Sequence, residues 1–219
     1  SVGVPAALFL AKNKLKVLVI DQFASQGQGS NKAAIGGIRA THSDPAKIKL
    51  CQRTLEIVSN WESTYGHNLE WSKGGYCFVA YREQEEQLLK NLLVVQKGYG
   101  LAIDWLDKQA LLAQIPDLNP SGLLGGTLSP DDGHCSTLLA GHAYYDAARS
   151  YGAEFHYLEQ VISFIIENEK IKGVATDKDI YYSPVVINAA GPWAKQVGEL
   201  AGLSHPVTPD SHEAGITEP

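Results

Sequence analysis

The sequence predicts an α/β fold, α+β overall, in which one helix-and-strand domain is interrupted by a β-rich insertion. Residues 4–21 have the pattern of a helix followed by a buried strand that ends on an acid. Residues 69–134 contain short strands separated by turns, and residues 153–191 return to strands that end in a glycine turn. A domain that is left by the chain and later resumed gives this order of elements.

The opening stretch is typical of a dinucleotide-binding unit. Val4, Ala7, Leu8 and Ala11 recur at helical spacing, residues 15–20 are almost all apolar, and Asp21 ends the strand. Residues 1–3 align with the last three positions of the fingerprint G-x-G-x-x-G. We therefore expect the front of a dinucleotide-binding domain whose first strand is missing. An ordinary helix–strand unit, with an acid after its strand, is the alternative.

The remaining elements follow from periodicity and from turn residues. In the middle of the chain we expect helices at 45–65, 83–99, 108–114 and 136–151, with strands on both sides of Gly74-Gly75 and at 103–106 and 123–128. Towards the end we expect a strand at 153–157, a hairpin of 161–167 and 170–176, a strand at 180–182, a buried strand at 183–191 and a helix at 192–200.

Composition limits the classes of partner. The chain has 219 residues, 44% hydrophobic and 19% charged, with a net charge of -6, so neither nucleic acid nor an anionic membrane is an expected partner. No apolar run is long enough for a transmembrane segment. The 3 cysteines are scattered without a CxxC pair, and no set of residues has the spacing of a metal site. These features predict a protein of a reducing compartment, the cytoplasm, with no metal.

A glycine-rich segment follows the acid at the end of the first strand. Residues 22–37 contain few large side chains and include Gly27, Gly29, Gly36 and Gly37. Such a backbone can approach a flat ligand closely and donate N–H groups to it. A flexible surface loop has the same composition, and the position directly after Asp21 favours ligand contact.

Three stretches together resemble the D-amino-acid oxidase superfamily of FAD enzymes, most of all sarcosine oxidase β-subunits, glycine oxidases and related amine dehydrogenases. They are Gly3 with Asp21, the segment 36–39, and residues 186–194, VINAAGPWA. The resemblance implies a Rossmann-like FAD-binding domain of residues 1–68 and 135–203. It also implies part of a substrate domain in residues 69–134 and 204–219, where 212–219 resembles the family's return strand. The chain is shorter than full-length members, so we expect it to be truncated at both ends.

The resemblance also implies a set of cofactor contacts. Gly3 would lie near the pyrophosphate, Asp21 near the ribose and Val161 near the adenine, and Gln22 would also contact the cofactor. The other implied FAD contacts lie in the two glycine-rich stretches: Gly29, Ser30, Asn31, Gly36, Gly37, Ile38, Ala190, Gly191 and Trp193. For each of them, packing is the alternative role.

Two residues are implied to act on the substrate. Arg39 would pair with a substrate carboxylate, and His42 would transfer a proton or border the flavin. The implied reaction oxidises the C–N bond of a small amino acid by hydride transfer to FAD. The candidate substrates include secondary amino acids and are sarcosine, glycine and proline. Arg39 could equally bind phosphate, as in a glycerol-3-phosphate or 2-hydroxyacid dehydrogenase. A non-catalytic fragment or subunit without FAD is a third hypothesis, and a partner subunit or a homo-oligomer is compatible with all three.

Overall fold

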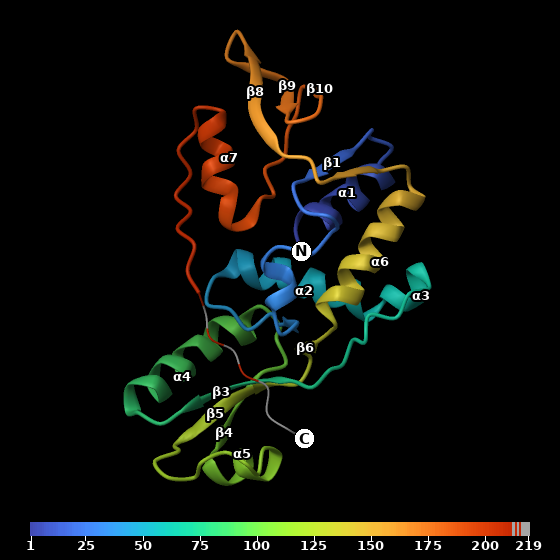
Figure 1. Cartoon of the computed structure of the whole chain (residues 1–219). Helices are drawn as coiled ribbons and strands as arrows, with labels where there is room; N and C mark the ends of the chain where they lie inside the picture. The colour runs from blue at the N-terminus through green and yellow to red at the C-terminus, as the bar shows by residue number, and fades with distance from the viewer. Residues whose placement is uncertain (212, 214, 216–219) are drawn as a thin grey trace. The chain divides into compact units, whose positions relative to one another are not determined.

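The computed structural model describes residues 1–211, 213 and 215 as two compact units (Figure 1). Unit 1 comprises Ser1–Ile35 and Thr137–Pro219, and unit 2 comprises Gly36–Ser136. The chain thus leaves unit 1, forms unit 2 and returns to unit 1. The FAD-binding ranges 1–68 and 135–203 remain a prediction about which residues serve the cofactor.

Unit 1 is built on a helix pair and a parallel strand pair. Helix α1 (Gly3–Lys12) leads into β1 (Leu18–Asp21), which pairs in parallel with β7 (Glu154–Tyr157). Helix α6 (Thr137–Ser150) lies beside α1 in Figure 1, and the two contact each other. Their buried residues are mostly alanines, which let two helices approach closely: Ala7, Leu8, Ala11, Ala143, Ala147 and Ala148. The helical spacing of residues 7, 8 and 11 therefore marks the buried face, as predicted.

A three-stranded meander completes unit 1. Strands β8 (Val161–Glu167), β9 (Lys170–Thr176) and β10 (Ile180–Tyr182) form an antiparallel sheet in the order β10-β9-β8. Asn168 and Glu169 have φ of 50° and 60°, and such paired positive φ values form the tight turns of hairpins. The predicted bounds of these three strands are confirmed. The short helix η2 (Gly191–Trp193) and helix α7 (Ala194–Leu200) follow.

The buried strand predicted for residues 183–191 is wrong. The structure describes this whole segment and has no strand in it, and Val185 and Ile187 are 69% and 54% exposed. The N–H of Ser183 donates to the carbonyl of Lys172 on β9 at 2.8 Å, and the Ser183 hydroxyl donates to the carbonyl of Val185 at 2.8 Å. An apolar run becomes a strand only where a neighbour supplies ladder hydrogen bonds, and within the described residues β1 pairs with β7 alone.

Unit 2 holds a second antiparallel sheet. Strands β3 (Tyr76–Ala80), β5 (Gly125–Ser129) and β4 (Asp104–Asp107) lie in that order, with α4 (Glu83–Gly98) and α5 (Lys108–Gln114) packed against them. The helix predicted at 45–65 is two helices, α2 (Pro45–Ser59) and α3 (Trp61–Tyr65). Asn60 separates them, and its side-chain amide caps the end of α2 by donating to the carbonyl of Glu56 at 2.8 Å.

Two short elements connect the ends of unit 2. Strand β2 (Gly37–Ile38) pairs antiparallel with β6 (Gly133–His134), which places the start and the end of the unit side by side. No helix among the described residues is long and apolar enough to cross a membrane. The return strand predicted at 212–219 includes residues 212, 214 and 216–219, which lie outside the described residues, and the cytoplasmic location stays a prediction.

Candidate functional site

The amino end of α1 offers unpaired backbone donors. Within the described residues no side chain caps the helix, and the N–H groups of Gly3 and Val4 make no hydrogen bond there. A Cβ placed on Gly3 would lie 3.4 Å from the Cβ of Ala189, which is van der Waals contact with the segment before η2. The helix end therefore presents the partial positive charge and close access that favour an anion such as a pyrophosphate.

Asp21 stands at the carboxyl end of β1 with one oxygen available. Its Oδ1 accepts from the backbone N–H of Phe23 at 3.0 Å, and its backbone carbonyl accepts from the N–H of Glu159 at 3.1 Å. The residue is half-buried and Gln22 beside it is exposed. The Phe23 bond fixes the carboxylate, and within the described residues Oδ2 has no hydrogen-bond partner and can accept a ligand hydroxyl, which is what a ribose would need.

The glycine-rich loop after Asp21 is anchored on its own unit. The Tyr157 hydroxyl donates to Oε1 of Gln26 at 3.0 Å, and the Asn31 amide donates to the carbonyl of Thr137 at 3.2 Å. Ser30 is exposed at the start of the short helix η1 (Ser30–Ala33). These hydrogen bonds hold the loop in place, and its contact with a ligand stays a prediction. The Asn31 amide is used in its hydrogen bond to Thr137, so the Asn31 side chain anchors the loop.

The two predicted stretches of unit 1 meet at Trp193. A Cβ on Gly29 would lie 3.7 Å from the Trp193 ring, and the Phe23 and Trp193 ring centroids are 5.7 Å apart, edge to face. Asn188 shapes the intervening turn: its Oδ1 accepts from the N–H of Ala190 at 3.2 Å and its amide donates to the carbonyl of Ala194 at 2.8 Å. Residues separated by more than 160 positions, Gly29 and Trp193, thus line one place at the end of β1.

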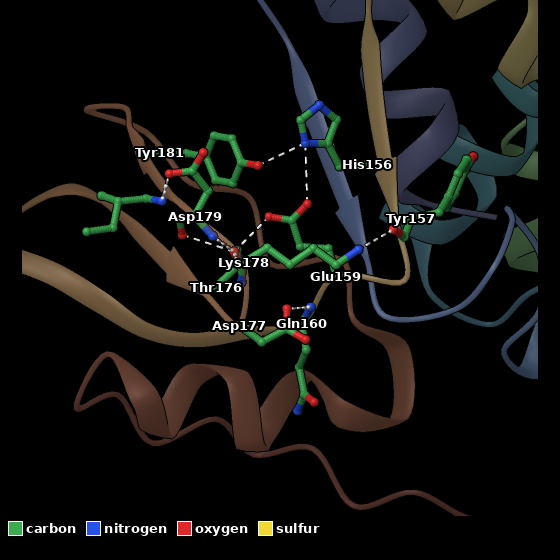
Figure 2. Close-up of polar contacts among 10 residues, drawn as sticks. His156, Tyr157, Glu159, Gln160, Thr176, Asp177, Lys178, Asp179 and Tyr181 are labelled. Carbon is green, nitrogen blue, oxygen red and sulfur yellow. Dashed lines mark hydrogen bonds and ion pairs between the residues drawn. The ribbon is translucent and has the colours of Figure 1, made fainter.

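Val161 begins β8, two positions after Glu159. Figure 2 shows the Glu159 carboxylate between Thr176 and His156. The Glu159 side chain is 4% exposed, its Oε1 accepts from the Thr176 hydroxyl at 2.7 Å, and its Oε2 lies 3.3 Å from Nδ1 of His156. The same His156 nitrogen is 2.9 Å from the Tyr181 hydroxyl. Because the N–H of Glu159 bonds to Asp21, this cluster links the meander to the end of β1.

Replacing Glu159 by Gln is expected to cost about 1–3 kcal/mol of stability at neutral pH, because the Thr176 and His156 partners lose an ionised acceptor. The Thr176 hydrogen bond lowers the pKa of Glu159, with Tyr181, His156 and Lys178 adding to the effect. A lowered folded-state pKa gives stability that is present above the unfolded pKa and lost as pH falls through the folded one.

Denaturant unfolding of the wild type and E159Q from pH 7 down to about pH 3 checks this expectation. The difference in free energy of unfolding between the wild type and E159Q should shrink as the pH falls below the ordinary pKa range of carboxyl groups. E154Q, which changes an exposed acid on β7, the strand that precedes Glu159, is the matched control. A difference that stays constant with pH, or that E154Q reproduces, would show that the Glu159 charge contributes nothing.

The first residues of unit 2, 36–38, pack closely against neighbouring segments of the same unit. Gly36 is buried and accepts from the N–H of Cys135 at 3.0 Å, and Gly37 and Ile38 pair with His134 and Gly133. A Cβ on Gly37 would lie 2.3 Å from the Tyr76 hydroxyl oxygen, so only glycine fits without moving that ring. The predicted contacts Gly36, Gly37 and Ile38 therefore form one rigid backbone edge.

Arg39 leaves this edge and lies on an aromatic platform. Its Cζ is 5.5 Å from the Tyr76 ring centroid and 5.1 Å from that of Phe78, both on β3. Nη1 donates to the backbone carbonyl of Thr41, and 3.4 Å separates it from the Thr41 hydroxyl. The platform holds the guanidinium plane while Nε and Nη2 have no hydrogen bond within the described part of the chain. A half-buried guanidinium with free donors suits a carboxylate or a phosphate.

His42 is half-buried just before α2. Burial lowers its pKa, and the positive charges of Arg39 and Lys47 lower it further, against a smaller opposing effect of Asp132. The imidazole is therefore neutral at neutral pH and can accept a proton. Its backbone carbonyl accepts from the buried amide of Gln96 at 3.2 Å, which fixes the residue's position.

Sequence reasoning missed two buried acids that hold these elements, Asp132 and Glu159. Asp132 is 1% exposed and its Oδ1 accepts from the N–H of Ala40 at 2.8 Å. The Asp-Gly pair at 132–133 signals a turn, which is the one sequence feature that could have drawn attention to it. Glu159 carries no such signal, because only the packing of three strands buries it. Among the described residues, no group of three or more His, Cys, Asp and Glu side chains could hold a metal ion.

The family described as FAD dependent oxidoreductase (DAO) matches residues 1–219. Mitochondrial dimethylglycine dehydrogenase of Mus musculus is 25% identical over 216 residues, which cover 99% of this chain and 25% of that protein. Glycine oxidase of Geobacillus kaustophilus is 28% identical over 218 residues, covering 95% of this chain and 56% of that protein. The chain therefore spans about a quarter to about half the length of these relatives.

Solved structures of similar proteins have the same fold. L-proline dehydrogenase from P. horikoshii superposes with a TM-score of 0.86 at 30% identity, covering 92% of this chain and 53% of that one. Glycine oxidase from Geobacillus kaustophilus gives a TM-score of 0.80 at 23% identity, covering 93% and 56%. The predicted fold class and the resemblance stated from the sequence are both confirmed.

Proposed function

Because this chain belongs to the family of FAD-dependent oxidoreductases, we propose that it serves an enzyme that oxidises the C–N bond of a small amino acid. Secondary amino acids are included, with sarcosine, glycine and proline as the candidate substrates. The relatives named above act, by their names, on dimethylglycine, glycine and L-proline, and each of these carries a carboxylate beside an amine. The proposal rests on Arg39, whose guanidinium lies on two aromatic rings. Its Nε and Nη2 atoms make no hydrogen bond within the described residues and can donate to a carboxylate.

The cofactor of the family is FAD, and the residues of unit 1 fit it. The free N–H groups at Gly3 suit its pyrophosphate, the available oxygen of Asp21 suits its ribose, and Trp193 beside Gly29 supplies an apolar wall. We further propose that Val161 contacts the adenine through its backbone, and that Gln22, Ser30, Asn31, Ala190 and Gly191 border the cofactor. In unit 2 we assign the backbone of Gly36, Gly37 and Ile38 to the flavin ring.

The side chains of unit 2 then orient the substrate and move its proton. FAD, when bound, supplies the two-electron acceptor for the C–N bond. Arg39 donates two hydrogen bonds to the substrate carboxylate, which fixes the carbon that loses the hydride. His42, kept neutral by burial and by its cationic neighbours, accepts the proton that the ammonium must lose before oxidation. The resulting imine is hydrolysed by water.

A second candidate function follows from the same guanidinium, because it binds phosphate as readily as carboxylate. L-alpha-glycerophosphate oxidase from Mycoplasma pneumoniae gives a TM-score of 0.75 at 22% identity, a likeness that concerns the fold alone. The choice between an amino acid and a phosphorylated or hydroxylated substrate therefore rests on a direct test.

Anaerobic mixing of the flavin-loaded protein with a substrate panel provides that test. We expect sarcosine, glycine or proline to bleach the flavin absorbance, and glycerol 3-phosphate and lactate to leave it unchanged. Bleaching by glycerol 3-phosphate or lactate alone would replace the proposal with the second candidate. A flavin-loaded protein that no member of the panel reduces would contradict both.

A further inference from the structure

We propose that Asp132 is a positioning residue for Arg39, which we call the substrate clamp. Asp132 fixes the backbone that carries Arg39, and it also fixes the start of β3, whose aromatic rings support the Arg39 guanidinium. The inference rests on the proposed function of Arg39 and adds a residue that touches neither substrate nor cofactor. Asp132 would act through two hydrogen bonds, one from its side chain and one from its main chain.

The side-chain bond immobilises the residue after Arg39. The Asp132 carboxylate is 1% exposed, and its Oδ1 accepts from the N–H of Ala40 at 2.8 Å, inside the unit. On the other side of Arg39, Ile38 is paired with Gly133 in the β2–β6 ladder. The backbone of Arg39 is thus held at both neighbours by two consecutive residues, so the guanidinium starts from a fixed point.

The main-chain bond fixes the aromatic platform. The carbonyl of Asp132 accepts from the N–H of Gly75 at 2.9 Å, directly before Tyr76 at the start of β3. Tyr76 supplies one of the two rings under the guanidinium. One residue therefore ties the arm that carries the clamp to the surface on which the clamp lies, and a shift at Asp132 would move the two against each other.

The second carboxylate oxygen of Asp132 allows the role of its hydrogen bond to be distinguished from the role of its charge. Oδ2 is buried and has no hydrogen-bond partner within the described residues, an arrangement that normally costs stability. An asparagine could accept from Ala40 without this burial of charge. Arg39, Lys47, His42 and Cys51 are charged or titratable groups near Asp132, and Asp132 acts on His42 and Cys51. The inference therefore rests on the hydrogen bond from Ala40 to Oδ1 and not on the charge.

The alternative is that Asp132 only stabilises the fold, and variants at neighbouring positions separate the two roles. Asp132→Ala removes the acceptor for Ala40, and Asp132→Asn keeps an acceptor while removing the charge. Asp131→Ala is the matched control, because Asp131 is 58% exposed and pairs with Lys73 at 3.1 Å. A purely structural role would lower the melting temperature without separating substrate affinity from the rate at saturation.

Stopped-flow reduction of the flavin-loaded variants by sarcosine or proline measures half-saturation and limiting rate. We expect Asp132→Ala to raise the half-saturating concentration about tenfold with at most about a threefold change in limiting rate. Asp132→Asn should recover most of that loss and Asp131→Ala should match the wild type. Unchanged half-saturation in Asp132→Ala, or equal damage in Asp132→Asn, would overturn the inference.

Amide hydrogen exchange of the segment 38–42 gives a readout that does not depend on turnover. It should accelerate in Asp132→Ala and not in Asp132→Asn or Asp131→Ala, and equal exchange in all variants would overturn the inference. If wild-type flavin is reduced by no amino acid, the proposed function fails while this exchange experiment still decides the role of Asp132. Asp132→Ser, whose hydroxyl is too short to reach Ala40, replaces the alanine variant if that variant does not fold.

Discussion

Replacing Arg39 by Ala is expected to raise the half-saturating concentration of the amino acid substrate roughly 100-fold, because two charge-assisted hydrogen bonds to the carboxylate are lost. Arg39→Lys should recover only part of this loss. A lysine keeps the charge but lacks the planar pair of donors, and it stacks less well on Tyr76 and Phe78. Stopped-flow reduction of the flavin-loaded variants measures the effect.

Arg53→Ala is the matched control for this prediction. Arg53 lies on the exposed side of α2, 64% exposed and paired with Glu56 at 2.5 Å, and its loss should leave substrate affinity unchanged. If Arg39→Ala bound sarcosine or proline as well as the wild type does, the carboxylate clamp would lie elsewhere. If the variant lost affinity for inorganic phosphate and for no carboxylate, Arg39 would be a phosphate-binding residue.

Gly133→Ala is expected to destabilise unit 2 by at least about 3 kcal/mol, or to prevent its folding. A Cβ on Gly133 would lie 2.0 Å from the backbone carbonyl oxygen of Ser72, which cannot rotate away as a side chain could. Relief of the clash requires separation of β6 from the chain at Ser72, with which His134 exchanges two backbone hydrogen bonds. Thermal unfolding should show a fall of roughly 10 °C.

Gly98→Ala is the control for Gly133→Ala. Nothing lies within 4 Å of a Cβ at Gly98, the last residue of α4, so alanine there should be neutral or slightly stabilising. Equal stability of the two variants would show that β6 and Ser72 separate at little cost. The β2–β6 connection would then be too weak to hold the Arg39 segment.

Local signals predicted the elements that depend on local interactions. The hairpin of β8 and β9 and the short helix α5 have the predicted bounds, because turn residues and helix signals lie within a few positions of each other. The strand predicted at 183–191 failed because a strand requires a partner, and no property of the segment itself reports whether one is present. The break at Asn60 depends on a single side chain that bonds back to the helix.

The residues of the candidate site likewise include some that local signals predicted and some that they did not. Asp21, Gly29 and Trp193 were identified from short motifs, and the structure brings them to one end of β1. Asp132 and Glu159 were missed because each becomes important only through partners about 20 to 90 positions away, namely Ala40 for Asp132 and Thr176 for Glu159. A buried acid has no periodicity or composition by which a sequence reveals it.

The flavin content of the purified protein tests most directly the claim that this constellation binds FAD. We expect a yellow protein with about one FAD per chain. Asp21→Ala should lose at least about tenfold in affinity for FAD, because the ribose loses its charged acceptor, whereas the exposed Asp117→Ala should match the wild type. A well-folded but colourless wild-type protein that added FAD does not turn yellow would contradict the account.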